Sequence, residues 1–520
     1  MPNRMQYSDA GSGAVAQLFS PREVRALEEW VRNTHGIDPL HLMERAGEAS
    51  LRWIRKRWPT IRRIGILTGT GNNGGDGLVL ARLAQGEGYE VKVFLTGPIR
   101  SEPARTMWSR LRSQPVPFET HTESATYKPE LWVDGLLGIG MNRPPEGASL
   151  EAIHFLNQTH VPVLSLDIPS GLDAGTGSLP GGAGSAVCAS STLTFLCWKR
   201  GLFTGEAANQ VGCDLVLDDL GLPDSAWSRE ATGASLLSQG ELSVSLPARQ
   251  RVSQKGDYGR LLIAGGGPGM GGAIRLAAEG ALRAGAGLVS VVTHPEHVAG
   301  LLAARPEAMI HGSGTGEIPQ HLLERADVAV VGCGAGQEEW GRLMCEQMMD
   351  WPGPVVVDAD GLNWLARFPR KRGRWILTPH PGEAARLLGL PVSTIQGDRF
   401  SACSRLAERY GAIAVLKGAG SLISGPLIRV CRVCPYGNPG MASGGMGDLL
   451  AGLIGGLAAQ RLPLEQAASM GVLVHALAGD RAAQAGGERG LLATDLLPQV
   501  QALVNPVPAH CQRIVKHDSN

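Results

Sequence analysis

A glycine-rich run leads into a carboxylate near the end of the chain. Residues 437–452 read Gly-Asn-Pro-Gly-Met-Ala-Ser-Gly-Gly-Met-Gly-Asp-Leu-Leu-Ala-Gly, and the apolar residues that follow predict a helix. Free N–H groups and the helix dipole favour phosphate at such a helix start. The predicted anion hole consists of the amides of Gly444, Gly445, Met446 and Gly447. Asp448 would lie in the first turn; since phosphate repels a carboxylate, we expect it to take a proton from a hydroxyl.

A second glycine-rich run follows an apolar segment near the start of the chain. Residues 69–77 read Gly-Thr-Gly-Asn-Asn-Gly-Gly-Asp-Gly, which contains the Gly-x-Gly-x-x-Gly of a dinucleotide site before a helix predicted over 78–83. The acidic residue that would hold a ribose is absent from the end of the next apolar run, 91–97. Asn72, Asn73 and Asp76 also crowd the turn, so an ordinary redox site is disfavoured.

Carboxylates and hydroxyls follow two further apolar runs in the same half. Asp134 follows one, and the segment Asp167-Ile-Pro-Ser-Gly-Leu-Asp, which contains Ser170, follows the next. Such oxygens suit a hard cation or proton transfer. The alternative is that Asp134 and Asp167 only cap helices and turns.

Polar residues also follow apolar runs in the second half. Lys417-Gly-Ala-Gly-Ser421 offers the small residues that a nucleotide needs for close approach of the backbone, and Thr378-Pro-His-Pro-Gly-Glu383 adds an imidazole and a carboxylate. His380 and Glu383 could instead be a turn residue and a helix-start acid. No Gly-x-x-x-x-Gly-Lys-Ser/Thr pattern occurs, so phosphate would be held by residues 437–452.

Short apolar runs alternate with helical patterns along most of the chain, which is the βαβ rhythm of a parallel sheet. We predict strands over these runs: 64–68, 91–95, 131–133, 161–166, 192–196, 261–264, 288–292, 328–331, 355–357, 375–377 and 413–416. The fold class is therefore α/β. Ligands bind beyond the carboxyl ends of parallel strands, where the polar motifs fall in both halves, so we expect two sites.

The length of 520 residues predicts two domains. The pattern lapses between residues 218 and 247, and we assign the domains to residues 1–230 and 240–520. Equal numbers of basic and acidic residues, 48 each, disfavour nucleic acid as a partner. The absence of a signal pattern or long apolar run predicts a soluble, cytoplasmic protein.

The nine cysteines are odd in number and scattered. The expected state of Cys188, Cys197, Cys333 and Cys403 is a buried reduced thiol. Cys431 and Cys434 form a Cys-x-x-Cys without the second ligand pair of a zinc site.

The motifs of the first half resemble the YjeF N-terminal family, the NAD(P)H-hydrate epimerases. They are Leu-Met-Glu-Arg-Ala-Gly at 42–47, the asparagine-rich glycine run, Val-Asp-Gly-Leu-Leu-Gly at 133–138, and the segment from Asp167; the resemblance covers about residues 15–225. It implies a Rossmann-like three-layer domain that interconverts the R and S forms of NADHX and NADPHX, nicotinamides damaged by addition of water. It also implies a potassium site formed by Asn73, Asp134 and Ser170.

The same resemblance implies a set of substrate-binding residues, with Asp167 also handling the proton. They are Asn72, Asn73, Gly74, Gly75, Asp76, Gly77, Gly138, Ile139, Gly140, Met141, Asn142, Arg143, Pro144 and Asp167.

The second half, about residues 245–505, resembles the ribokinase-like superfamily and, within it, the ADP- or ATP-dependent NAD(P)H-hydrate dehydratases. The matching runs begin at Lys255, Ala284, Asp358, Thr378 and Asn438. A family run often written Gly-Pro-Gly-x-Gly is here Gly-Cys-Gly-Ala-Gly at 332–336, which keeps all three glycines.

This resemblance implies that ADP or ATP phosphorylates the S-hydrate hydroxyl and that loss of phosphate then restores NADH or NADPH. Asp448 would be the base, and Glu383 would position magnesium through water. The implied hydrate contacts are Ala273, Gly336, His380 and Asp448. The implied nucleotide contacts are Lys417, Gly418, Ala419, Gly420, Ser421 and Gly447.

We therefore predict a bifunctional repair enzyme that acts on small molecules, without a nucleic-acid or membrane partner, and that forms a homo-oligomer. The first alternative is a ribokinase-like vitamin or sugar kinase that stops at phosphoryl transfer. The second is a nucleotide sensor whose sites bind without reacting.

Overall fold

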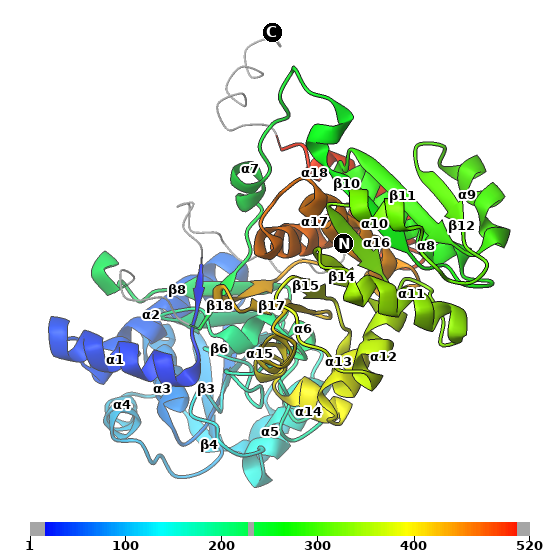
Figure 1. Ribbon diagram of the computed structural model, residues 1–520. Coiled ribbons are helices and arrows are strands. Elements are labelled where there is room, and N and C mark those ends of the chain that lie inside the picture. The colour runs from blue at the N-terminus through cyan, green and yellow to red at the C-terminus, as the bar shows by residue number, and fades with distance from the viewer. Residues whose placement is uncertain (1–15, 227–232, 507–520) are drawn as a thin grey trace. The chain divides into compact units, whose positions relative to one another are not determined.

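The computed structural model describes residues 16–226 and 233–506 (Figure 1). The chain divides into two compact units, Met1–Ser235 and Leu236–Asn520. The outer ends of the predicted domains, residues 1, 230 and 520, lie outside the described residues. No helix among the described residues is long and apolar enough to cross a membrane.

The first unit contains a parallel sheet in the order β4-β3-β2-β5-β6-β7-β8. The strand order reverses beside β2, as in doubly wound dinucleotide-binding folds. Its strands are β2 (Arg63–Thr68), β3 (Glu90–Leu95), β4 (Phe118–Thr120), β5 (Leu131–Gly135), β6 (Val163–Leu166), β7 (Ser191–Phe195) and β8 (Asp214–Asp218). Two further strands, β1 (Gln17–Leu18) and β9 (Ala234–Leu236), form a short antiparallel pair that is not part of this sheet.

Two apolar cores cover the two faces of this sheet. Ile64 and Ile66 of β2 pack in a cluster with residues of α1 to α4, whereas Leu67 packs in a cluster with Ile153 of α5. Because side chains alternate between the faces of a strand, this division gives the expected three layers. The helices are α1 (Pro21–His35), α2 (Pro39–Arg57), α3 (Asn72–Gly86), α4 (Glu102–Arg112), α5 (Gly147–Gln158) and α6 (Ala207–Gln210).

The second unit contains a mixed sheet in the order β18-β17-β16-β15-β14-β13-β10-β11-β12. The neighbours from β16 to β12 are parallel, and β17 and β18 add an antiparallel edge. The strands are β10 (Arg260–Ala264), β11 (Leu288–Thr293), β12 (Met309–Gly312), β13 (Val328–Val331), β14 (Val355–Val357), β15 (Trp375–Leu377), β16 (Ile413–Leu416), β17 (Ser421–Gly425) and β18 (Ile428–Cys434). The predicted α/β class is confirmed.

The helices of the second unit precede, connect or follow these strands. They are α7 (Glu241–Ser245), α8 (Gly271–Ala284), α9 (Val298–Ala304), α10 (Gln320–Arg325), α11 (Glu339–Asp350), α12 (Ala359–Arg367), α13 (Pro381–Leu388), α14 (Val392–Gly397), α15 (Arg399–Tyr410), α16 (Met446–Ala459), α17 (Leu464–Gly486) and α18 (Leu496–Leu503).

Helix α16 packs against α8 with almost no space between the two backbones. A Cβ on Gly452 would lie 1.9 Å from the carbonyl oxygen of Ala277, and one on Gly456 would lie 2.7 Å from that of Ala281. Since only glycine permits this approach, the two glycines fix where the N-terminus of α16 lies.

The cysteines differ in part from the prediction. Those of the described residues form no disulfide, and Cys197, Cys333 and Cys403 are buried as expected. The expectation of burial is wrong for Cys188, which is exposed because it lies between the β6 and β7 strands rather than within one. Cys511 lies outside the described residues.

Two candidate active sites

The first site is a cavity of about 810 Å³ in the first unit, bordered by the ends of its central strands. The whole predicted loop from Gly138 to Pro144 lines it, together with Asn72, Asn73, Asp76 and Asp167. The glycines Gly74, Gly75 and Gly77 do not line it. They pack inward instead, and a Cβ on Gly74 would lie 2.2 Å from the carbonyl oxygen of Gly69.

The helix that follows the glycine run begins earlier than the sequence suggested. We expected it to begin at Leu78, but α3 starts at Asn72, with Gly71 as its N-cap. The predicted turn residues therefore form the first turns of the helix. This places Asn73 and Asp76 three residues apart on one helix face that borders the cavity.

The three predicted potassium ligands converge beside this cavity. The buried carboxylate of Asp134 accepts hydrogen bonds from the hydroxyl of Ser170 at 2.5 Å and from its amide at 2.9 Å. The side-chain amide of Asn73 donates to the carbonyl of Leu137 at 3.1 Å, and the hydroxyl of Ser170 accepts from the backbone amide of Leu137 at 2.8 Å. Burial raises the pKa of Asp134, and its hydrogen bonds to Ser170 oppose this shift.

Asp167 lies at the end of β6 with an unusual backbone. Its φ of 63° falls in the left-handed region, which is uncommon outside glycine and is typical of residues held in place for function. Its amide donates to the carbonyl of Leu193 at 2.7 Å. Its Oδ1 contacts the ammonium of Lys199, a residue that sequence reasoning missed.

The second site lies at the carboxyl ends of β13, β14, β15 and β16. Helix α16 begins at Met446, as the prediction required, and its N-cap Gly445 has a φ of 86°. The amides of Gly447 and Asp448 have no hydrogen-bond partner among the described residues, as expected of a helix start that can bind an anion. Asp448 lies in the first turn.

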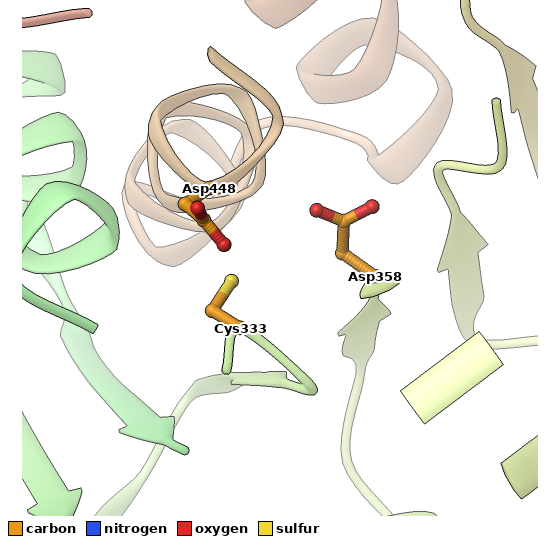
Figure 2. Close-up of side chains that lie close together, drawn as sticks. All are labelled: Cys333, Asp358 and Asp448. Carbon is orange, nitrogen blue, oxygen red and sulfur yellow. The ribbon is translucent and has the colours of Figure 1, made fainter. Parts of the chain in front are cut away.

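Asp448 faces a buried thiol. Figure 2 shows the side chains of Cys333, Asp358 and Asp448 close together, and their Sγ and carboxylate oxygen atoms lie within 4.8 Å of one another. Burial and the charge of Asp358 raise the pKa of Asp448 to about 6, while a hydrogen bond from Cys333 opposes this shift. A carboxylate with such a pKa is suited to exchange protons near neutral pH.

Lys417 supplies the positive charge of the site. Its ammonium donates to Oδ1 of Asp358 at 2.8 Å and lies 3.9 Å from Oε2 of Glu383. Burial alone would lower the pKa of Lys417, but Asp358 and Glu383 outweigh burial and raise it. A Cβ on Gly447 would lie 3.2 Å from this ammonium, so Lys417 and the anion hole are adjacent.

The predicted nucleotide loop is the tight turn between β16 and β17. Gly418 and Gly420 have φ values of 138° and 62°, which other residues rarely adopt, and Ser421 donates to the carbonyl of Gly418 at 3.1 Å. The guanidinium of Arg399, a residue that is 1% exposed, donates to the carbonyl of Lys417 at 3.2 Å. Ala419 completes the turn.

His380 and Glu383 begin helix α13. Nδ1 of His380 accepts from the amide of Gly382 at 3.0 Å, and the carboxylate of Glu383 accepts from the amide of His380 at 2.8 Å. Burial and Lys417 lower the pKa of His380, while burial raises that of Glu383 to about 7. Glu383 is thus an acid at a helix start, as the alternative interpretation had it, and His380 is the N-cap of the same helix. The carboxylate of Glu383 also lies 3.9 Å from the ammonium of Lys417.

The remaining predicted hydrate contacts lie on neighbouring segments. Gly336 donates its amide to Asp360 of α12 at 2.8 Å. Ala273 lies in the first turn of α8 and packs close to Gly334. A Cβ added to Gly334 would lie 3.0 Å from the Cβ of Ala273. Ala273 therefore lies against the loop that carries Cys333, and Gly336 of that loop is held by α12.

Sequence reasoning missed the individual roles of Lys199, Cys333, Asp358 and Arg399. The runs that contain Cys333 and Asp358 were recognised because each follows a predicted strand, but neither side chain was given a role. Lys199 and Arg399 belong to no motif that the sequence analysis singled out.

Comparisons with known proteins cover both halves. The family model described as "YjeF-related protein N-terminus" matches residues 39–201, and that described as "NAD(P)H-hydrate dehydratase" matches residues 261–502. A bifunctional NAD(P)H-hydrate repair enzyme of Coxiella burnetii is 45% identical over 94% of this chain and 99% of its own length. A protein of the same name from Escherichia coli is 42% identical over 93% of each chain.

Among solved structures, an ADP/ATP-dependent NAD(P)H-hydrate dehydratase from Bacillus subtilis, co-crystallised with ATP and Mg²⁺, is 29% identical. It covers 51% of this chain and 96% of its own, with a TM-score of 0.47.

Two α/β units, each with polar groups beyond the ends of its parallel strands, define a two-domain α/β enzyme. The sequence identity to relatives that match over nearly their full length identifies the family within this class. The chain belongs to the family of bifunctional NAD(P)H-hydrate repair enzymes.

Proposed function

We propose that this protein repairs hydrated nicotinamide nucleotides in two steps. The first unit interconverts R- and S-NAD(P)HX, and the second unit dehydrates the S form to NAD(P)H while ADP is converted to AMP and phosphate. The observation that carries the proposal is the position of Asp448, in the first turn of α16 and beside the Lys417–Asp358 ion pair. The relatives that carry the same name over nearly the whole chain support it.

In the second unit, Asp448 takes the proton of the substrate hydroxyl. The oxygen then attacks the terminal phosphorus of ADP, and the bond from that phosphorus to the bridging oxygen breaks to release AMP. The amides of Gly444, Gly445, Met446 and Gly447 stabilise the charge on the transferred group. The carbon–oxygen bond of the phosphate ester then breaks, phosphate leaves with the electron pair, and the neighbouring carbon loses a proton to water, which restores the ring double bond.

The nucleotide is held by the turn from Lys417 to Ser421 and by Gly447, with ATP as a possible second donor. Ala273, Gly336 and His380 contact the hydrate. Magnesium, when bound, neutralises phosphate charge. Glu383 holds the magnesium through water. Its carboxylate lies among the polar groups of the site: Oε2 is 3.9 Å from the ammonium of Lys417, and Oε1 is 3.5 Å from Nε2 of His380.

In the first unit, Asp167 handles the proton of the hydroxyl, and Asn72 to Gly77 and Gly138 to Pro144 hold the substrate. Potassium, when bound, supplies a positive charge beside the hydrate. Asn73, Asp134 and Ser170 fit this ion because Oδ1 of Asn73 is buried and lacks any hydrogen-bond partner among the described residues. Oxygen atoms of this kind suit a hard cation.

We further propose that the domains extend over residues 1–230 and 240–520 and that the protein is a cytoplasmic homo-oligomer acting on NADHX, NADPHX and ADP. Size measurement by light scattering tests the oligomer.

The test of the dehydratase assignment uses purified S-NADHX with ADP and Mg²⁺, followed by the absorbance of restored NADH. Asp448→Asn keeps the shape of the side chain but cannot accept the proton, so we expect the rate to fall by at least about 100-fold. Asp350→Asn, at an exposed acidic residue on α11, is the matched control. A normal rate in Asp448→Asn would rule out Asp448 as the base.

A further inference from the structure

The cavity of the first unit contains a cluster of three carboxylates and one buried ammonium. Glu28 of α1, Asp76 of α3 and Asp167 after β6 all line it, as does Lys199 after β7. The carboxylate of Glu146 and the guanidiniums of Arg25, Arg100 and Arg143 line the cavity as well; Arg25 acts on Glu28, and the thiol of Cys197 lies near Lys199. Within the cluster, the buried ammonium contacts one carboxylate, that of Asp167, so the three carboxylates are not equivalent.

Lys199 is held in one position by its three hydrogen bonds. Its side chain is 1% exposed, and the ammonium donates to Oδ1 of Asp167, to the hydroxyl of Thr194 at 3.0 Å and to the carbonyl of Phe195 at 2.6 Å. An ammonium has three donors, so all of them are used. The lysine therefore has no donor left for a substrate and acts through its partner Asp167.

Asp167 presents one of its two oxygens to the cavity. Oδ1 contacts Lys199 and also accepts from the amide of Phe195 at 3.3 Å. Oδ2 has no hydrogen-bond partner among the described residues and would lie 3.8 Å from a Cβ on Gly138, a residue of the cavity loop. This oxygen is free to receive a proton from a bound molecule.

The other two carboxylates are biased towards their neutral forms. Burial and then the charge of Asp167 raise the pKa of Asp76 well above its usual range, with Glu28 adding to the effect. Burial and Asp167 also raise the pKa of Glu28. Asp167, by contrast, contacts the ammonium of Lys199 directly.

We propose that Lys199 is a positioning residue that fixes the negative charge of the cavity on Asp167 and leaves Asp76 as the uncharged, proton-donating partner. The inference rests on the proposed epimerase function of this unit. The inference adds Asp76 as the acid to Asp167, the base already proposed. It also gives a reason why these two aspartates of one cavity have different roles.

The pair accounts for both protons of the epimerisation. Water adds to an enamine at the carbon next to nitrogen, so the hydrate carries its hydroxyl on a carbon bonded to the ring nitrogen. Asp167 takes the hydroxyl proton, the carbon–nitrogen bond breaks with its electron pair on nitrogen, and Asp76 gives that nitrogen a proton. The resulting aldehyde rotates, nitrogen adds to its other face, and both protons return, so that nothing is consumed.

The test measures the conversion of pure S-NADHX to the R form by chromatography. ADP is left out so that the second unit cannot dehydrate the substrate. We expect Lys199→Met to slow exchange by at least about 100-fold, as loss of acid–base function usually does. Lys199→Arg keeps the positive charge beside Asp167 and should restore most of the exchange rate that Lys199→Met loses.

Two further variants complete the test. Asp76→Asn, which cannot give up a proton, should lose exchange while the variant remains folded, and Lys128→Met at an exposed lysine should behave as wild type. A wild-type rate in Lys199→Met, a rate in Lys199→Arg no higher than that of Lys199→Met, or wild-type exchange in Asp76→Asn would overturn the inference. Absence of exchange in the wild type would instead refute the epimerase function itself.

Discussion

The ammonium of Lys417 lies 2.8 Å from Oδ1 of Asp358, and the pair borders Gly447 at the N-terminus of α16. Asp358 is 1% exposed, and its Oδ1 also accepts from the hydroxyl of Thr378 at 2.8 Å. The pair thus links three strand ends to the helix start that is proposed to hold phosphate. Removing one member of a buried pair leaves the other charge uncompensated.

Lys417→Met should therefore weaken ADP binding and destabilise the second unit by about 3 kcal/mol, the usual cost of breaking a buried ion pair. Calorimetric titration with ADP and urea unfolding measure the two effects. Lys371→Met, at an exposed lysine, is the control and should change neither. Unaltered ADP affinity in Lys417→Met would contradict the assignment of the nucleotide loop.

The pH dependence of dehydration should follow Asp448. Its pKa is raised to about 6, and a base must be ionised, so the rate with saturating S-NADHX should be level above this pH. Below it, the rate should fall about tenfold per pH unit. Burial raises the pKa of a second group, Glu383, to about 7. The pH–rate profile of Glu383→Gln is therefore the control: the fall in rate near pH 6 should persist in this variant.

Cys333 should tune this profile. The thiol donates a hydrogen bond that lowers the pKa of Asp448, so Cys333→Ala should move the acid limb to higher pH. Cys333→Ser keeps a donor and should keep the limb close to that of the wild type. Superimposable profiles for Cys333→Ala and wild type would show that the thiol does not act on Asp448.

Gly447 should not tolerate a side chain. A Cβ there would lie 3.2 Å from Nζ of Lys417 and 3.4 Å from Oδ2 of Asp358, in the space proposed for phosphate. We expect Gly447→Ala to raise the KM for ADP by at least about tenfold, equivalent to about 1.4 kcal/mol. Gly486→Ala, at a helix glycine with open space around it, is the matched control. Equal KM values for the two variants would argue against phosphate at Gly447.

Epimerisation should depend on potassium. Ser170→Ala removes a hydroxyl that contacts Asp134 and the backbone of Leu137, so the exchange of R and S forms should lose its response to added K⁺. A titration with K⁺ against Li⁺ measures this response. Ser178→Ala, outside the proposed ligands, should respond as the wild type does, and a normal K⁺ response in Ser170→Ala would contradict the ligand set.

Much of the fold was readable from the sequence because buried parallel strands are continuous apolar runs. The predicted strand over 328–331 coincides with β13, and α16 begins where the glycine run gives way to apolar residues. The start of α3 was missed for a physical reason. Glycine is a poor helix former, yet Gly74 and Gly75 lie inside α3 because the backbone of Gly69 and the side chain of Met43 leave no room for a Cβ.

The residues that adjust charge in the two sites were the least predictable. Lys199 and Cys333 act through contacts with Asp167 and Asp448, which lie 32 and 115 positions away in the chain. Such contacts arise only when strand ends are brought together. A local pattern can identify the carboxylate that faces the substrate but not the group that sets its charge.

The most direct test of the two-step repair is the fraction of a mixed hydrate that the protein restores. Purified protein is incubated with R- and S-NADHX, Mg²⁺, K⁺ and ADP, and the absorbance of NADH is followed to its end point. The rate of R-to-S exchange without protein is measured separately and subtracted. We predict complete recovery of both forms. Recovery of the S fraction alone would contradict the epimerase, and no recovery would contradict the dehydratase.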